Sequence, residues 1–270
     1  MTSQPGFTQW LLASVLERLR LDAGMTCGDA AMAIGVARQT VSRWEAGLHR
    51  IPASAVKNLC EVYGATTEET NELYSMTLRP KDSIGNVWER ARQNRTWRAI
   101  IVAESLARHI YNVEPLYVPG LLQTPEYWWH LNITSPDPKA ASENGFAFRR
   151  ERQRTVFQRS EPPLMTFLVG EPAMRYMLSL EGVSESQTAR LRAANRYGNV
   201  DIRVFSHPVE SAFAVFESGS RVRGTFVCVD QIDGTRYTDN REAVASHMRM
   251  YRHLVADAVP LDQYLIQRQS

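Results

Sequence analysis

The spacing of apolar residues predicts short helices in the first quarter of the chain. The first helix carries apolar residues three or four positions apart, so they share one face; they are Leu12, Val15, Leu16 and Leu19. Gly24 interrupts this pattern, and Thr26 has the chemistry of an N-cap for a second helix. The second helix has a small apolar face made of Ala30, Ala31 and Ile34.

Two more helices are predicted before residue 75. A third helix follows Gly35, covers residues 37–46 and ends at Gly47. Val56, Leu59 and Val62 mark a fourth helix. The first part of the chain is therefore expected to be all-α.

The pattern is different in the longer remainder of the chain. Residues 91–160 are expected to be helical at both ends. The first of these helices is predicted from residues that repeat with a period near 3.6; they are Trp97, Ile101, Glu104, Arg108 and Tyr111. Four apolar or alternating segments after residue 163 predict strands; they are LMTFLV, VDIRVF, SAFAVFE and GTFVCVD.

Helices are expected between and after these strands. One begins near Glu171, one opens with a capping box formed by Ser184 and Gln187 and stops at Gly198, and a last one starts at Asp239. The predicted fold class is α+β, with an N-terminal all-α domain over 1–75, a linker over 76–90 and a larger α+β domain with a small β-sheet over 91–270.

The net charge of the whole chain says little about its partners, but the distribution of charge along the chain is informative. The 270 residues carry a net charge of +2, and 44% of them are hydrophobic, which is ordinary for a globular protein. Residues 31–60 contain four Lys and Arg residues against Glu45 alone, whereas residues 61–72 contain four glutamates. A local basic face suits DNA binding, although a solvated helix face has the same composition.

Several classes of chemistry find no support in the sequence. Cys27, Cys60 and Cys228 stand far apart, so no zinc site or disulfide framework is indicated. No apolar run is long enough to cross a bilayer, and the N-terminus has no basic segment of a signal peptide, which predicts a cytoplasmic protein. Motifs of hydrolases and nucleotide-binding enzymes are missing, so we expect no catalytic residues, metal or cofactor.

Residues 24–47 carry the most informative pattern. Two short helices that cross steeply need a small residue in the turn, and Gly35 supplies it. The inward positions are apolar, namely Ala31, Ile34, Val36, Val41 and Trp44. The outward positions of the second helix are suited to base edges and phosphates; they are Arg38, Gln39, Thr40, Ser42 and Arg43.

The segment GVARQTVSRWEAG resembles the helix-turn-helix of the lambda-repressor-like or xenobiotic-response-element family, over about residues 8–75. The resemblance implies that 37–46 is the recognition helix. By position, Arg38, Gln39 and Arg43 would contact bases, and Thr40 and Ser42 would contact phosphate. The family's buried ion pair maps onto Arg20 and Glu45.

Two positions depart from the family pattern. Cys27 stands where the family usually has a glutamine that binds phosphate, and Ala37 stands where the recognition helix usually has a Ser or Thr cap. Replacing a good cap with alanine costs about 1 kcal/mol of helix stability.

The second half is similar to the C-terminal domain of WhiJ-like, or antitoxin-like, actinobacterial regulators. The segments VPGLLQT and RRERQR carry most of the similarity, which spans roughly 95–265. The resemblance implies a regulator that is often paired with a small protein encoded nearby. The domain would bind that protein, a ligand or a second copy of itself.

A candidate ligand or partner region lies within the same segment. Its members are Leu121, Gln123, Tyr127, Trp128 and Trp129. Aromatic residues at this density usually serve a core, so packing is the competing interpretation. The arginines between Arg149 and Arg159 are expected on a helix, where they either contact DNA or form a solvated or internally paired face.

We therefore expect a sequence-specific transcriptional regulator, a repressor or a developmental switch protein. It would bind double-stranded DNA as a homodimer on an inverted repeat. The alternative hypothesis is an antitoxin-like protein whose C-terminal domain neutralises a small partner and whose DNA binding is autoregulatory.

Overall fold

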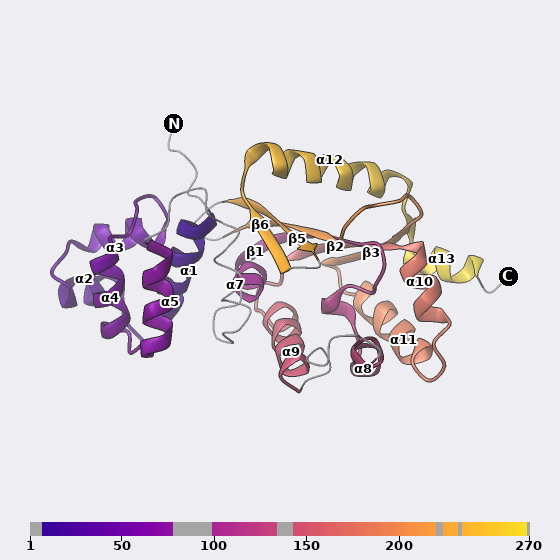
Figure 1. Cartoon of the computed structure of the whole chain (residues 1–270), viewed down its shortest axis with the longest axis horizontal. Coiled ribbons are helices and arrows are strands. Elements are labelled where there is room, and N and C mark those ends of the chain that lie inside the picture. The colour runs from indigo at the N-terminus through magenta and orange to yellow at the C-terminus, as the bar shows by residue number, and fades with distance from the viewer. Residues whose placement is uncertain (1–6, 78–98, 134–142, 220–223, 232–233, 269–270) are drawn as a thin grey trace. The chain divides into compact units, whose positions relative to one another are not determined.

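The computed structural model describes residues 7–77, 99–133, 143–219, 224–231 and 234–268 (Figure 1). The chain divides into two compact units. The first contains Met1–Ala107, Glu217–Phe226 and Gly234–Asn240, and the second contains Arg108–Phe216, Val227–Asp233 and Arg241–Ser270. None of the helices in the described ranges is long and apolar enough to span a membrane.

Five helices form the N-terminal part of the first unit; they are α1 (Phe7–Asp22), α2 (Cys27–Ala33), α3 (Arg38–Glu45), α4 (Ala53–Val62) and α5 (Thr67–Thr77). The predicted apolar face of α1 is buried, with Leu12, Val15 and Leu16 each at most 4% exposed. Val41 of α3 and Val56 of α4 are fully buried as well. Burial of these faces drives the packing of helices that are individually too short to be stable.

Helix α5 is an addition to the predicted elements. Thr66 caps it, because the Thr66 hydroxyl accepts a bond from the Glu69 backbone and the Glu69 carboxylate accepts one from the Thr66 backbone. Leu73 and Met76 then bury its apolar side. The helix reaches the first two residues of the predicted linker, 76–90, and the rest of that linker lies outside the described residues.

The prediction of a helix from Trp97 to Tyr111 is wrong for the second half of that segment. Helix α7 (Ala99–Leu106) ends before Arg108, and strand β1 (Ala107–Glu114) follows directly; Trp97 lies outside the described residues. The strand buries Ala107, Ile110 and Val113. That spacing of three imitates a helical period, because an inner parallel strand is covered on both faces and lacks the usual alternation.

The strands form one sheet in the order β6-β5-β4-β1-β2-β3-β7. The remaining strands are β2 (Leu164–Gly170), β3 (Val200–Phe205), β4 (Phe213–Ser218), β5 (Thr225–Gln231), β6 (Gly234–Thr238) and β7 (Val259–Pro260). β1 pairs in parallel with β2, and β2 with β3, whereas β7 pairs antiparallel with β3. The four predicted strands are present, and β1, β6 and β7 are additional among the described residues.

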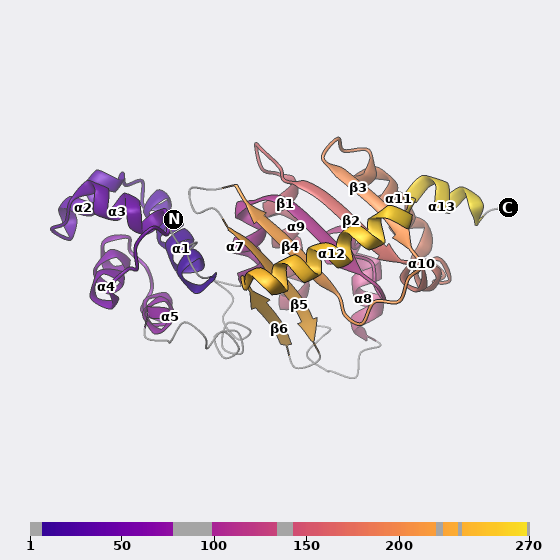
Figure 2. The same cartoon turned by 90° about the horizontal axis from the view of Figure 1, so that it is seen from above.

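Helices cover both faces of the parallel strands in the second unit. Helix α12 (Arg241–Asp257) crosses one face, as Figure 2 shows from above. The opposite face carries α8 (Pro125–Ile133), α9 (Glu143–Phe157), α10 (Glu171–Leu178) and α11 (Ser184–Asn195). Tyr251 and Leu254 of α12 join Val113, Leu168 and Phe205 in one apolar core. The α+β fold class is therefore confirmed.

The capping box predicted from Ser184 and Gln187 is wrong. Val183 occupies the N-cap position of α11 and makes no side-chain cap. The Gln187 side chain is fully buried instead, where it donates to the Leu122 carbonyl oxygen and accepts from the Thr124 amide. A glutamine already satisfied by a distant loop is not available to its own helix end.

Two helix boundaries also differ from the sequence prediction. Helix α11 ends at Asn195, three residues before Gly198. Helix α12 begins at Arg241 and is followed by a short terminal helix, α13 (Leu261–Gln267), so it is not the last helix.

Gly170 lets β2 pass close to the end of β1. A Cβ atom on Gly170 would lie 2.2 Å from the carbonyl oxygen of Pro115, and this neighbour is backbone that cannot rotate away. We expect Gly170→Ala to lower the free energy of unfolding by about 1–3 kcal/mol. Gly198→Ala is the matched control, because nothing lies within 4 Å of its added Cβ. Equal urea denaturation midpoints for the two variants would contradict this packing.

Candidate nucleic-acid interface

Helices α2 and α3 are joined by the tight turn that the sequence predicted. Gly35 in this turn adopts a φ of 69°, a left-handed conformation that glycine accepts without strain. The Val36 amide then donates to the Ala31 carbonyl oxygen at 2.9 Å. Thr26 caps α2 through a reciprocal bond pair with Asp29. These local bonds fix the direction of α3 relative to α2.

The inward side of α3 is anchored to the helices around it. Val41 is fully buried, and Trp44 is 8% exposed. Gln9 of α1 donates to the carbonyl oxygen of Gly47, just beyond the end of α3, at 2.8 Å. Ala31 is buried on the facing helix, whereas Ile34 and Val36 in the turn are half-buried. Helix α3 is thus held along its length.

The outward side of α3 presents three of the five predicted contact residues to solvent. Arg38, Gln39 and Arg43 are exposed, and none of their side chains has a hydrogen bond or ion pair within the described part of the chain. Gln39 and Arg43 lie four residues apart and therefore share a helix face. Thr40 and Ser42 are half-buried at the margins of this surface.

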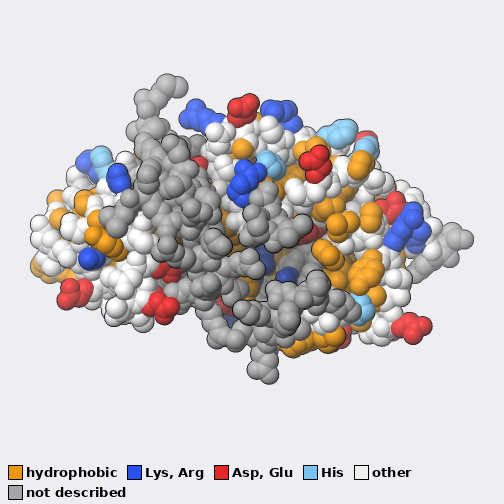
Figure 3. Space-filling model, viewed as in Figure 1, with side chains coloured by type: hydrophobic (Ala, Val, Ile, Leu, Met, Phe, Trp, Pro, Cys, Tyr) orange, Lys and Arg blue, Asp and Glu red, His pale blue; other side chains and the backbone are white. Residues whose placement is uncertain are grey.

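Charges of the two signs occupy different sides of the N-terminal helices. In Figure 3 the blue and pale blue side chains lie mainly along the upper edge of this part, and the red ones gather along its lower edge. Helix α5 carries three glutamates, Glu68, Glu69 and Glu72, and no basic residue. Helix α3 itself carries Arg38 and Arg43 and one acidic residue, Glu45, which is buried, so its exposed charges are positive, as contact with an anionic polymer requires.

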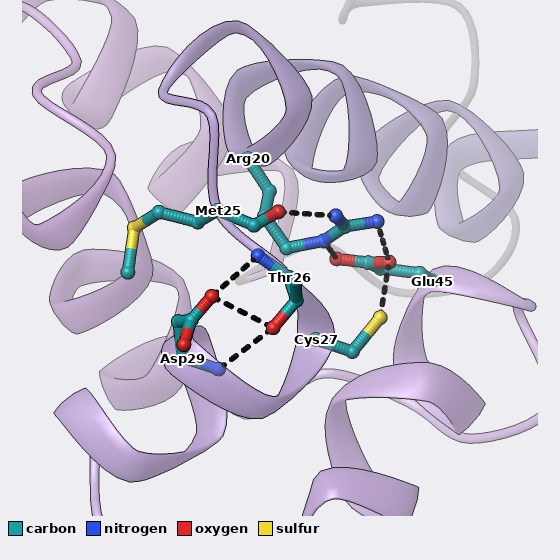
Figure 4. A network of polar contacts seen from close by, with 6 residues as sticks. All are labelled: Arg20, Met25, Thr26, Cys27, Asp29 and Glu45. Carbon is teal, nitrogen blue, oxygen red and sulfur yellow. Dashed lines mark hydrogen bonds and ion pairs between the residues drawn. The ribbon is translucent and has the colours of Figure 1, made fainter.

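A buried ion pair connects α1 with α3. The Arg20 guanidinium donates to both carboxylate oxygens of Glu45, at 2.8 and 2.9 Å, and also to the Met25 carbonyl oxygen at 2.7 Å (Figure 4). The two residues are 5% and 2% exposed. The bond to Glu45 raises the pKa of Arg20 above its ordinary value, against the opposing effect of burial. The pair predicted from sequence is thus brought together as a bidentate contact.

The two residues that depart from the family pattern have clear positions. The Cys27 thiol lies 3.5 Å from a Glu45 carboxylate oxygen, so it faces the buried ion pair (Figure 4). Ala37 occupies the N-cap of α3 without a side-chain bond, while its carbonyl oxygen accepts from the Thr40 amide. Neither side chain supplies the phosphate or cap contact that the family pattern has at that position.

The candidate ligand or partner region of the second unit is mostly internal. Leu121, Gln123, Tyr127 and Trp128 are buried, and Trp129 is half-buried. The Gln123 amide nitrogen donates to the Val118 carbonyl oxygen, and the Tyr127 hydroxyl accepts from the Val118 amide. Only Trp129 offers appreciable surface in this arrangement.

A polar pocket in the second unit was not predicted as a site. It lies along α9 and α11 and has a volume of about 580 Å³. Arg150 and Arg154 of α9 belong to the arginine run that the sequence left open between DNA contact and a solvated or paired face. The spacing of four between these two arginines was the only sign of the pocket in the sequence. The other lining residues, Arg190 of α11 and Tyr197 beyond it, are distant in the sequence. No group of His, Cys, Asp or Glu among the described residues could hold a metal ion.

Two segments of the chain match known protein families. Residues 11–73 match a family described as a helix-turn-helix domain. Residues 97–263, more than half of the chain, match a family described as a domain of unknown function, DUF5753. No curated protein matches the chain.

Removal of one partner from the buried ion pair should be costly. Glu45→Gln leaves the Arg20 charge buried without compensation, and we expect a loss of about 3–5 kcal/mol in the free energy of unfolding of the N-terminal helices. Asp22→Asn is the control, because it breaks the exposed Arg18–Asp22 pair at 3.7 Å and should cost less than about 1 kcal/mol. Chemical denaturation followed by circular dichroism measures both. Similar losses would show that the buried pair does not anchor α3.

Glu72 should make stability depend on pH. Burial, followed by the charges of Glu68 and Glu69, raises the pKa of Glu72 from 4.5 to about 7. Between these values the folded protein retains a proton that the unfolded chain releases, so stability falls as pH rises. Glu72→Gln should therefore stabilise the protein at about pH 8 and have less effect at about pH 4. A stability gain independent of pH, or one shared by exposed Glu61→Gln, would contradict this assignment.

Proposed function

Because the chain belongs to the DUF5753 family and carries a helix-turn-helix domain at residues 11–73, we propose that it is a transcriptional regulator that reads double-stranded DNA with α3. In this proposal residues 1–75 bind the operator and 91–270 regulate that binding. Helix α3 enters the major groove, where each base pair offers a distinct pattern of donors and acceptors.

One observation carries the proposal. The side chains of Arg38, Gln39 and Arg43 are exposed and have no partner in the described part of the chain. They stand on a helix whose other side is held by the buried pair of Arg20 and Glu45. Arginine pairs well with guanine, and glutamine pairs with adenine. Thr40 and Ser42, at the margins, would contact the phosphates that set the register.

We infer further that the operator is an inverted repeat bound by a dimer. A single recognition helix of eight residues covers only a few base pairs. Dimers of this class reach two half-sites about 34 Å apart, one turn of DNA. The WhiJ-like resemblance supports a regulatory role for the second domain, through a ligand or a small partner protein. An antitoxin-like role would instead make neutralisation of that partner the main activity.

Selection from a random DNA library by the full chain tests the proposal. We expect an enriched inverted repeat. Fluorescence anisotropy should then show that Arg38→Ala weakens operator binding by about 1–3 kcal/mol, roughly 5- to 150-fold, and relaxes the preference at one position of each half-site. Arg18→Ala on α1 is the control, and its affinity should stay within about 2-fold of the unchanged protein.

Three results would count against this function. The first is a selection without an enriched motif, and the second is equal affinity for operator and scrambled DNA at raised salt, where phosphate contacts weaken. The third is an Arg38→Ala protein that keeps full affinity and specificity. An enriched single half-site bound by a monomer would contradict the dimer alone.

A further inference from the structure

The pocket along α9 and α11 has a composition that the DNA-binding role does not explain. Its volume, about 580 Å³, is in the range of small-molecule sites. It is lined by Ala147, Arg150, Glu151, Gln153, Arg154, Phe157, Gln158, Arg190 and Tyr197. All of these belong to the second unit. The lining combines guanidinium groups, amides and two aromatic rings.

The pocket carries three guanidinium groups that form no ion pair with the described residues. Arg150 and Arg154 are exposed and lie four residues apart on α9, so they share a face, and Arg190 faces them from α11. None of the three forms an ion pair within the described residues. Three guanidiniums against the single carboxylate of Glu151 leave an excess of positive charge. A concave surface of this kind attracts an anion.

Two aromatic rings form the other half of the pocket. The rings of Phe157 and Tyr197 have centroids 6.2 Å apart and are inclined by 40°. The Arg190 guanidinium already lies over the Phe157 ring, 5.1 Å from its centroid. Tyr197 is 51% exposed, so the edge or face of its ring is open to a second flat group.

The floor of the pocket is held in place by a contact on its other side. The Gln153 amide nitrogen donates to the carbonyl oxygens of Gly120 and Gln123, at 3.2 and 2.9 Å. These bonds tie α9 to the 3-10 turn at Gly120–Leu122. The arginines of α9 therefore stand on a fixed helix, and a ligand does not have to order the helix on binding.

We propose that this pocket binds a small organic anion with a planar ring. The acid group, a carboxylate or a phosphate, is held by Arg150 and Arg154, and the ring packs against Tyr197 and Phe157. As a description of an effector, this inference rests on the proposed regulatory role of the second domain. Binding itself is independent of whether the protein recognises DNA.

A small anion fits the pocket better than a nucleic-acid backbone does. A DNA backbone needs an extended row of cations, whereas the arginines here converge on one concave site together with exposed aromatic surface. Arginine forms two parallel bonds to a carboxylate or phosphate, which gives a small acid a defined orientation.

Titration calorimetry on the full chain can separate the parts of the proposed ligand. The probes are salicylate and phenyl phosphate, which carry a ring with a carboxylate or a phosphate. Salicylamide supplies the ring without the charge, and inorganic phosphate supplies the charge without the ring. We expect at least one aromatic anion to bind with a Kd below about 1 mM, and at least about 10-fold more tightly than either incomplete probe. The better of the two identifies the acid group.

Variants locate the binding. Arg150→Gln with Arg154→Gln, and separately Tyr197→Ala, should each weaken binding of the aromatic anion by about 10-fold or more. Arg196→Gln is the charge control because Arg196 is exposed outside the pocket, and Tyr117→Ala is the ring control because Tyr117 is also 51% exposed. Both controls should stay within about 2-fold. Unchanged thermal denaturation would exclude a folding defect in each variant.

The proposal is overturned if neither aromatic anion binds, if salicylamide or inorganic phosphate binds as tightly, or if binding survives the double arginine change. It is also overturned if the double change weakens binding to random double-stranded DNA while aromatic anions leave the protein unaffected, since the arginines then serve nucleic acid. Failure to find an operator by selection would contradict the proposed function and leave these binding measurements unaffected.

Discussion

The N-terminal helices depend on two opposite charges that have both left water. Removing an arginine and a carboxylate from solvent costs several kcal/mol for each ion, so the pair is stable only with close geometry and full hydrogen bonding. Arg20 achieves this with two bonds to Glu45 and a third to the Met25 carbonyl oxygen. Moving α3 relative to α1 would break these bonds and leave both charges buried and unpaired, so the pair fixes α3 on α1. Arg38 and Arg43 therefore face outward from a helix that is held in place.

The second unit uses neutral amides for a similar purpose. Gln187 and Gln153 reach from α11 and α9 to the backbone around Gly120–Leu122. Because buried backbone groups must find partners, these two glutamines specify where the helices sit on the loop. The same placement brings Arg154 and Arg190 to one pocket. The hydrogen bonds that place α9 and α11 on the loop therefore also bring the arginines of the two helices together in the pocket.

Agreement between sequence and structure is closest where a feature is local. The turn at Gly35, the cap at Thr26 and helix α3 depend on neighbouring residues, and each was predictable from them. The sequence prediction fails where a residue distant in sequence binds a side chain that the local pattern assigns to its own helix. Gln187 has the spacing of a capping residue, but the loop of residues 118–124 takes its side chain. The apolar spacing of β1 imitates a helix because the strand lies between β4 and β2.

The sequence alone determined the helix-turn-helix, its outward side chains and the α+β class, because hydrophobic period, caps and turn residues act within a few positions of one another. Only the tertiary structure decided which residues form the pocket of the second unit. Arg154 and Arg190 are far apart along the chain, and Tyr197 lies beyond the end of α11. Their meeting depends on how α9 and α11 pack on the sheet, and no local pattern in the chain encodes that contact.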